Sequence, residues 1–359
     1  MVLICPLEMV SGISHPLVKD RHLSMNLLLK KICVAFIISG LLLLEQAQAC
    51  SRIAYVSSQG TIIARTMDLY MDDHAKMMIY PRGITTKSNF AGGLSWVSKY
   101  GSVAIRSLGA ANSDGMNEKG FTANLLYLDG SEYEVRDQRL GVANIQLAQF
   151  MLDNFSTVSE ALEGFKQIQV ISAKASDREW PVHLSIADKN GDSAVIEFIK
   201  GKAVITRGPS TVVMTNEPPL SIQLENLKKY SGFGGKQYLP GDTDPSARFV
   251  RATAFLKTLP EPKTNEQALA NLFGVAHTVF VPRGAGDSAG SGSTDIWPTL
   301  WATMADSKNG VYYFQSSSAP NLIWLSFKNV RFDKGSPVLE LDVTNPSLAG
   351  NVSKKMKPL

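Results

Sequence analysis

Cys50 follows the run Ala47-Gln48-Ala49, which places small residues three positions and one position before it. This spacing is typical of the cut site of a secretory signal, and cleavage after Ala49 would make Cys50 the first residue. Cys50 then carries a thiol and a free α-amine. An α-amine with a pKa of about 7.7–8.0 can accept the proton of a thiol with a pKa of about 8.5. The pattern predicts a nucleophile with its own general base, which takes an acyl group onto sulfur and passes it to water.

The residues before Cys50 favour this cut site. Met25 is a better start than Met1, because a basic pair at Lys30-Lys31 then precedes an uncharged apolar run over residues 32–44. That run is shorter than the ~20 residues of a transmembrane helix. We expect residues 1–49 to be a signal region and residues 50–359 to form one catalytic domain, exported to the periplasm or secreted. An uncleaved membrane anchor and lipid attachment at Cys50 are the alternatives.

The composition is that of an ordinary globular protein, with 44% hydrophobic and 19% charged residues. The formal net charge of +4 is small for 359 residues and gives no support to nucleic-acid binding. Cys5 and Cys33 lie before the cut, so Cys50 is the only cysteine of the mature chain, which forms no internal disulfide. The sequence has no phosphate-binding loop, dinucleotide fingerprint or metal-spaced set of Cys and His, so we expect no cofactor and no metal.

A predicted β-hairpin returns two charged residues to Cys50. Residues 50–58 alternate in the manner of a strand, Gln59-Gly60 forms a turn, and a second strand begins over residues 61–64. The hairpin carries Arg65 and Asp68 back toward Cys50. We expect Asp68 to hydrogen-bond the Cys50 amine and the charge of Arg65 to lower the pKa of the thiol. A surface ion pair between Arg65 and Asp68 is the alternative interpretation.

Strands and helices alternate along the rest of the chain. Asn117 opens a turn before a strand over residues 121–127, and Thr157 begins a capping box for a helix that runs to about residue 168. His183 falls in a strand and is expected to be structural. The other expected strands cover residues 77–80, 101–105, 182–187, 194–199, 212–214, 301–304, 311–314 and the surroundings of Trp324, and the other helices cover residues 140–152, 246–256 and 264–276.

Two later segments add polar residues of possible chemical use. The strand near residue 213 ends in Asn216-Glu217-Pro218, where an Asn before Pro is otherwise a common turn residue. After a loop over residues 231–244, Asp244 and the proline that follows it form an N-cap and N1 pair. The helix that starts there carries Arg248, and we expect Arg251 on the same helix to be solvated. A Gly- and Ser-rich stretch over residues 285–294 is expected to be flexible.

The order of these motifs resembles that of the choloylglycine hydrolase and penicillin V acylase family of N-terminal-nucleophile hydrolases. The motifs are Arg-x-x-Asp after the N-terminal Cys, Asn-Glu-Lys-Gly before a strand, Thr-Asn-x-Pro, and Ser-x-Arg-Phe-x-Arg. They extend over nearly the whole mature chain. The matched positions, in chain order, are Cys50, Arg65, Asp68, Tyr127, Asn216 and Arg248.

The resemblance implies an α+β fold, a four-layer αββα sandwich with two antiparallel sheets between layers of helices. It implies that Asn216 offers its side-chain N–H to the oxyanion, that Tyr127 contributes to the same site, and that Arg248 reaches the cluster around Cys50. Members of the family are commonly homotetramers. The sequence itself shows mixed α and β content, and it neither supports nor excludes a tetramer.

The resemblance also implies a substrate class, the linear amides of small N-acyl compounds. Penicillin V acylases typically carry Tyr at the position of Tyr127, where bile salt hydrolases carry Asn, so we expect a phenoxyacetyl penicillin or an acyl-homoserine lactone. Leu69 and Tyr70 follow the Arg-x-x-Asp motif and are expected to shape the acyl pocket. The alternatives are a bile salt hydrolase, a lipid-anchored periplasmic binding protein that uses Cys50 only for lipid attachment, and a secreted inactive relative. No membrane insertion is expected after processing.

Overall fold

The computed structural model describes residues 50–175, 178–285 and 297–359. The predicted leader with its cut site, and all but the first residue of the predicted flexible stretch over residues 285–294, lie outside the described residues. No helix in the described ranges combines the length and the apolar character that a membrane crossing requires.

The hairpin predicted after Cys50 is confirmed. β1 (Ser51–Ser57) runs antiparallel to β2 (Gly60–Asp68), with Ser51 opposite Thr66 and Arg52 opposite Arg65. Both strands are almost fully buried, because both faces of their sheet are covered. Gly60 has a φ of 122° and lies against Lys308, so the tight turn depends on the absence of a side chain there.

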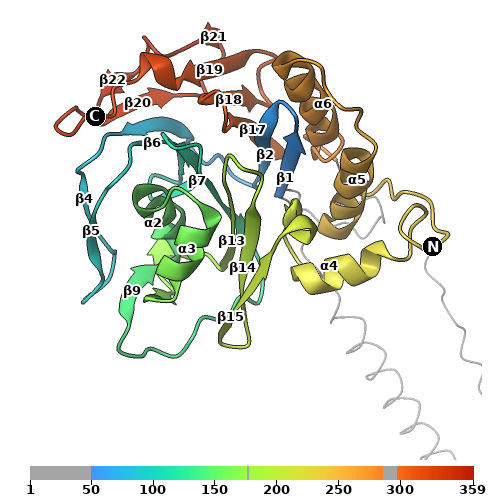
Figure 1. Ribbon diagram of the computed structural model, residues 1–359, viewed down its shortest axis with the longest axis horizontal. Helices are drawn as coiled ribbons and strands as arrows, with labels where there is room; N and C mark the ends of the chain where they lie inside the picture. Colours follow the sequence, from blue (N-terminus) through green and yellow to red (C-terminus); the bar gives the residue numbers. More distant parts are fainter. Residues whose placement is uncertain (1–49, 176–177, 286–296) are drawn as a thin grey trace, which may run out of the picture. The chain divides into compact units, whose positions relative to one another are not determined.

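The first sheet has seven strands and contains this hairpin near its middle (Figure 1). β2 lies between β1 and β17, so the strand that carries Arg65 and Asp68 is central and not at an edge. Every pairing is antiparallel except that of the last two strands. Across the sheet the strands are β16 (Val213–Thr215), β1, β2, β17 (Thr299–Asp306), β18 (Val311–Ser316), β19 (Leu322–Ser326) and β21 (Gly350–Asn351).

The second sheet has nine strands, all paired antiparallel. Its order across the sheet is β15 (Lys202–Arg207), β14 (Ser193–Ile199), β13 (Val182–Ala187), β8 (Thr122–Tyr127), β7 (Ala111–Asn117), β6 (Ser102–Ser107), β3 (Lys76–Tyr80), β20 (Leu339–Asp342) and β22 (Lys357–Pro358). Three two-stranded pairs complete the strands: β4 (Thr85–Lys87) with β5 (Ser95–Val97), β9 (Leu140–Ala143) with β10 (Ile168–Ile171), and β11 (Lys174–Ala175) with β12 (Arg178–Glu179).

Helices cover the outer faces of both sheets, which gives the expected four-layer αββα sandwich (Figure 1). α5 (Pro245–Lys257) and α6 (Asn265–His277) pack on the first sheet, and α2 (Leu147–Asn154) with α3 (Val158–Phe165) lies on the side of the second. One apolar core fills the space between the sheets, and another lies under α2 and α3. The remaining helical elements are η1 (Asn144–Gln146), η2 (Pro209–Thr211), α4 (Leu220–Leu227) and η3 (Phe327–Asn329).

Three predicted helix starts are confirmed by their caps. The side chain of Thr157 accepts the N–H of Glu160 at α3, and that of Asp244 accepts the N–H of Ala247 at α5. Thr264 caps α6 in the same way. Each cap satisfies a backbone donor that the helix itself leaves unpaired.

Two predictions about secondary structure and one about solvent exposure are wrong. The expected helix over residues 140–152 is a strand, β9, followed by a short helix, because β9 pairs in parallel with β10 and this tertiary pairing overrides the helical spacing. For the same reason α3 ends at Phe165, before β10 begins. Arg251 is not solvated: it is half-buried and donates to the carbonyls of Pro240, Asp242 and Thr278.

Candidate active site

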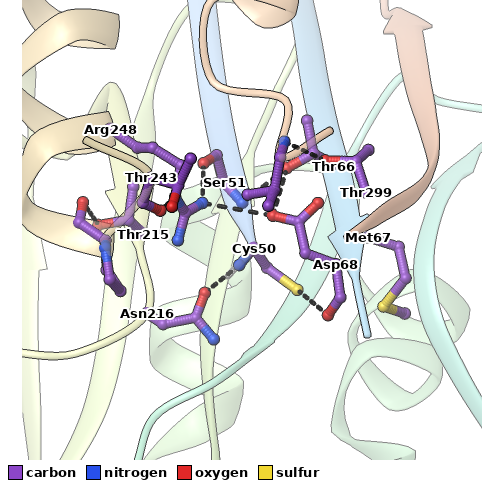
Figure 2. A network of polar contacts seen from close by, with 12 residues as sticks. Cys50, Ser51, Thr66, Met67, Asp68, Thr215, Asn216, Thr243, Arg248 and Thr299 are labelled. Atoms are coloured by element: carbon purple, nitrogen blue, oxygen red, sulfur yellow. Dashed lines mark hydrogen bonds and ion pairs between the residues drawn. The ribbon is translucent and has the colours of Figure 1, made fainter. Parts of the chain in front are cut away.

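The position of β1 between β16 and β2 in the first sheet brings the site together. Ser51 pairs with Thr66 on one side and with Thr215 of β16 on the other. The residue before Ser51 and the residue after Thr215 are therefore neighbours, which places Cys50 beside Asn216 at the end of the sheet. Figure 2 shows Asn216 facing Cys50 from one side and Asp68 from the other.

The thiol of Cys50 is buried against groups of β2. Its Sγ lies 3.8 Å from the carbonyl oxygen of Asp68 and 3.9 Å from Nη2 of Arg65. Burial raises the pKa of the Cys50 thiol, while the charge of Arg65 and, more weakly, that of Arg248 act in the opposite direction. The expected effect of Arg65 on the thiol is therefore present, but burial outweighs it.

Arg65 is held in place by contacts between the two sheets. Its Nη2 donates to the carbonyl of Leu125 at 3.2 Å and lies 3.4 Å from Sδ of Met67. The guanidinium stacks on the Trp301 ring, 4.6 Å from the ring centroid. Asp114, a buried carboxylate that accepts from Thr303, Tyr312 and Asn124, is placed to balance this charge. Burial raises the pKa of Asp114, and Arg65 is the foremost group that opposes the rise.

The nitrogen of Cys50 donates to Oδ1 of Asn216 and not to the carboxylate of Asp68 (Figure 2). The expected bond from Asp68 concerns the free α-amine of the processed chain and stays a prediction; in the unprocessed chain the Asp68 carboxylate lies against Arg248. Because Oδ1 of Asn216 accepts from the Cys50 nitrogen, Nδ2 of the same amide can donate to another group. Nδ2 is buried, and no described residue accepts a hydrogen bond from it.

Asp68, Arg248 and Ser51 form a fully buried polar network behind Cys50. Arg248 Nη1 donates to Ser51 Oγ at 2.6 Å and lies 3.4 Å from Oδ2 of Asp68, while its Nε donates to the carbonyl of Thr243 at 2.9 Å. Burial raises the pKa of Asp68 to about 7, and Arg248 is the strongest group acting against it. Arg248 reaches the site because it lies in the first turn of α5, directly after the Asp244 cap.

A mostly apolar cavity opens beside the thiol. Leu69 lines it, as predicted, and so does Tyr127 at the end of β8. Tyr70 does not line it: its side chain is 41% exposed, its ring lies 5.3 Å from that of Trp297, and its hydroxyl accepts from Arg178. The other lining residues are Cys50, Arg65, Met67, Asp68, Ser107, Leu108, Ala111, Ser113, Leu125, Leu126, Ile145, Trp180, Val182 and Trp297.

The structure therefore brings together Cys50, Arg65, Asp68, Asn216 and Arg248, with Tyr127 on the cavity wall. No sequence motif points to the tryptophans of the cavity and of the Arg65 stack, which are Trp180, Trp297 and Trp301. Their residue type was the available signal, because large aromatic side chains commonly line apolar cavities; Trp301 also donates from its indole to Asp73.

His183 lies on β13, buried, with Nδ1 3.5 Å from Glu197 Oε1, and it makes no contact with Cys50. Among the residues that the structure describes, no group of three or more His, Cys, Asp and Glu side chains is placed to hold a metal ion.

Comparisons with known proteins connect this geometry to characterised relatives. The family model for linear amide C–N hydrolases, choloylglycine hydrolase family, matches residues 50–340. A penicillin V acylase from Pectobacterium atrosepticum is 33% identical over 343 residues, covering 86% of this chain and 90% of that protein. A bile salt hydrolase/transferase from Lactiplantibacillus plantarum is 26% identical over 246 residues, covering 61% and 74%. The solved structure of penicillin V acylase from Agrobacterium tumefaciens matches with a TM-score of 0.78 at 32% identity, covering 86% of this chain and 98% of that one.

Proposed function

Because this chain belongs to the choloylglycine hydrolase family of linear amide C–N hydrolases, we propose that it cleaves its amide with Cys50 as an N-terminal nucleophile. Removal of residues 1–49 turns the Cys50 nitrogen from a peptide nitrogen into an α-amine. The amine takes the thiol proton, and the thiolate attacks the carbonyl carbon of the substrate. The amine product leaves with that proton, and water then hydrolyses the thioester.

The other site residues have separate roles in this reaction. Asn216 Oδ1 holds the amine so that its lone pair faces the thiol, and Asn216 Nδ2 donates to the oxyanion. The charge of Arg65 favours the thiolate over the thiol. Arg248 and Asp68 fix the end of β1 through Ser51, which keeps Cys50 in register with Asn216. Tyr127 forms part of the cavity wall.

The observation that carries this proposal is the two-sided use of the Asn216 amide. Its oxygen accepts from the Cys50 nitrogen, and its nitrogen is buried with no acceptor among the described residues. A buried amide N–H without an acceptor costs about 1–3 kcal/mol of stability. An oxyanion that forms beside the thiol during the reaction supplies the missing acceptor.

The cavity supports an apolar or aromatic acyl group as the part of the substrate nearest Cys50. Leu69, Met67 and Trp297 line it, and Tyr127 contacts the Trp297 ring edge-on with the ring centroids 5.8 Å apart. A phenoxyacetyl group or a fatty acyl chain matches this lining, so penicillin V and acyl-homoserine lactones are the proposed substrates. We further propose that the processed enzyme acts outside the cytoplasm, in the periplasm or beyond the cell.

A panel of substrates tests the proposal with the processed enzyme and a Cys50→Ala control. Release of 6-aminopenicillanic acid from penicillin V by the enzyme, and none by the control, is the expected result. Turnover of a conjugated bile salt with no turnover of penicillin V would keep the mechanism and overturn the acylase assignment. Equal activity of the Cys50→Ala variant on any of these amides would overturn the mechanism.

A further inference from the structure

A buried glutamine spans the turn that carries Asn216. Gln223 lies one turn into α4, with its side chain 1% exposed. Its Nε2 donates to Oγ1 of Thr215 at 3.3 Å and to the carbonyl oxygen of Glu217 at 3.1 Å. One amide group therefore bonds the residue before Asn216 and the residue after it.

The chemistry of the partners fixes which end of the Gln223 amide faces this turn. The carbonyl of Glu217 only accepts hydrogen bonds. The hydroxyl of Thr215 has one hydrogen, which it donates to the carbonyl of Pro245 at 3.0 Å, so toward Gln223 it can only accept. Both sites therefore require N–H donors, and the NH₂ group of Gln223 supplies two.

The helix that carries Gln223 is itself anchored to the second sheet. The N-cap of α4, Pro219, provides no side-chain cap, and the N–H of Leu220 instead donates to Oε1 of Glu197 at 2.9 Å. Glu197 is buried on β14, and a carboxylate at a helix N-terminus is electrostatically favourable. A continuous set of buried contacts thus leads from β14 through α4 and Gln223 to both neighbours of Asn216.

We propose that Gln223 is a positioning residue for the amide hydrolysis proposed above, one that holds the Asn216 side chain so that Nδ2 points toward the oxyanion. An oxyanion donor acts only when it lies about 2.7–3.1 Å from the oxygen that develops charge. Without Gln223 the turn loses two hydrogen bonds, one to the Thr215 hydroxyl and one to the backbone carbonyl of Glu217. Nδ2 of Asn216 then samples positions outside that narrow range. The inference rests on the proposed function of Asn216.

The test replaces Gln223 with methionine, which has the same length and no donor. We expect kcat on penicillin V, or on whichever N-acyl amide the wild-type enzyme hydrolyses, to fall roughly 10- to 100-fold, less than the roughly 100- to 1000-fold loss for a missing oxyanion donor. The Michaelis constant should change little, since the acyl cavity is untouched. Alkylation of Cys50 by iodoacetamide should keep its rate, because substitution at a saturated carbon forms no oxyanion.

Three further variants separate positioning from general loss of structure. Gln223→Glu places an acceptor against the Glu217 carbonyl and should lose more activity than Gln223→Met. The double variant Asn216→Ala with Gln223→Met should have the same kcat as Asn216→Ala alone, because both substitutions act through Nδ2 of Asn216. Gln169→Met removes another buried glutamine, whose Nε2 donates to Val135, and should keep wild-type kcat.

The outcomes distinguish this inference from the proposed function. A wild-type enzyme that hydrolyses no N-acyl amide would overturn both. An active wild type with unchanged kcat in Gln223→Met, or with additive losses in the double variant, would overturn the positioning role alone. A fall in the alkylation rate that matches the fall in kcat would also overturn it, since the damage would then lie at Cys50 itself.

Discussion

Replacing Arg248 with methionine should destabilise the protein by an amount that depends on pH. Arg248 and Asp68 are both fully buried, and Nη1 of Arg248 lies 3.4 Å from Oδ2 of Asp68. Removing one partner of a buried ion pair costs about 3–5 kcal/mol where the other group keeps its charge, and Asp68 keeps its charge only above its pKa. The hydrogen bonds from Arg248 to Ser51 and Thr243 are lost as well.

The pH dependence follows from the carboxyl group. In the wild type the pKa of Asp68 is raised from its ordinary value to about 7, so stability falls as pH rises from about 4 to about 7 and is level above that. Arg248 is the main group holding this pKa down, so Arg248→Met raises the pKa further. The variant then continues to lose stability above pH 7, at about 1.4 kcal/mol per pH unit relative to the wild type.

Urea unfolding of both proteins at pH 5.5, 7.0 and 8.5 measures this effect. The difference in unfolding free energy should be constant from pH 5.5 to 7.0 and then grow by about 2 kcal/mol at pH 8.5. A difference that stays level over the whole range would show that Asp68 does not depend on Arg248 for its charge, and the reasoning would be refuted.

Three further predictions concern the oxyanion donor, the cavity and a second buried acid. Asn216→Ala should lower kcat roughly 100- to 1000-fold in steady-state assays while circular dichroism stays that of the wild type, and activity within tenfold of wild type would contradict the donor role. Leu69→Trp fills the cavity and should raise the Michaelis constant for penicillin V at least tenfold. The rate of Cys50 alkylation by iodoacetamide should stay unchanged. An unchanged Michaelis constant would place the acyl group elsewhere. Burial raises the pKa of Asp153 to about 7 although its carboxylate accepts hydrogen bonds from Trp96 and Gln149, so the free energy of unfolding falls as pH rises from about 4 to 7. Asp153→Asn should remove this contribution to the difference in unfolding free energy between pH 5 and pH 7, measured by urea titration. An equal difference in both proteins would contradict the prediction.

The elements that the sequence predicts correctly are those with local signals. The Gln59-Gly60 turn and the alternation around it determine the β1–β2 hairpin, and Asp244 with the proline after it determines the start of α5. Because Arg65, Asp68 and Arg248 are placed directly by these two elements, most of the candidate site could be found from the chain alone.

The features that the sequence does not predict depend on contacts between distant segments. Residues 140–143 have helical spacing but form β9, because β10 offers a strand to pair with. The partner of the Cys50 nitrogen is Asn216, since β16 lies beside β1, an adjacency that no local pattern reports. Gln223 has the pattern of an ordinary helix residue, and its contacts on both sides of Asn216 exist only in the folded chain.

The measurement that tests the central claim most directly is the intact mass of the exported enzyme, taken before and during an acid-quenched reaction with penicillin V. We predict a chain that begins at Cys50 without lipid, and during turnover a second species heavier by one phenoxyacetyl group, which hydroxylamine removes as expected for a thioester. An active enzyme whose mass retains Ala49 would have no free amine at Cys50, and one that carries lipid on the Cys50 sulfur would have no free thiol; either result would contradict the account.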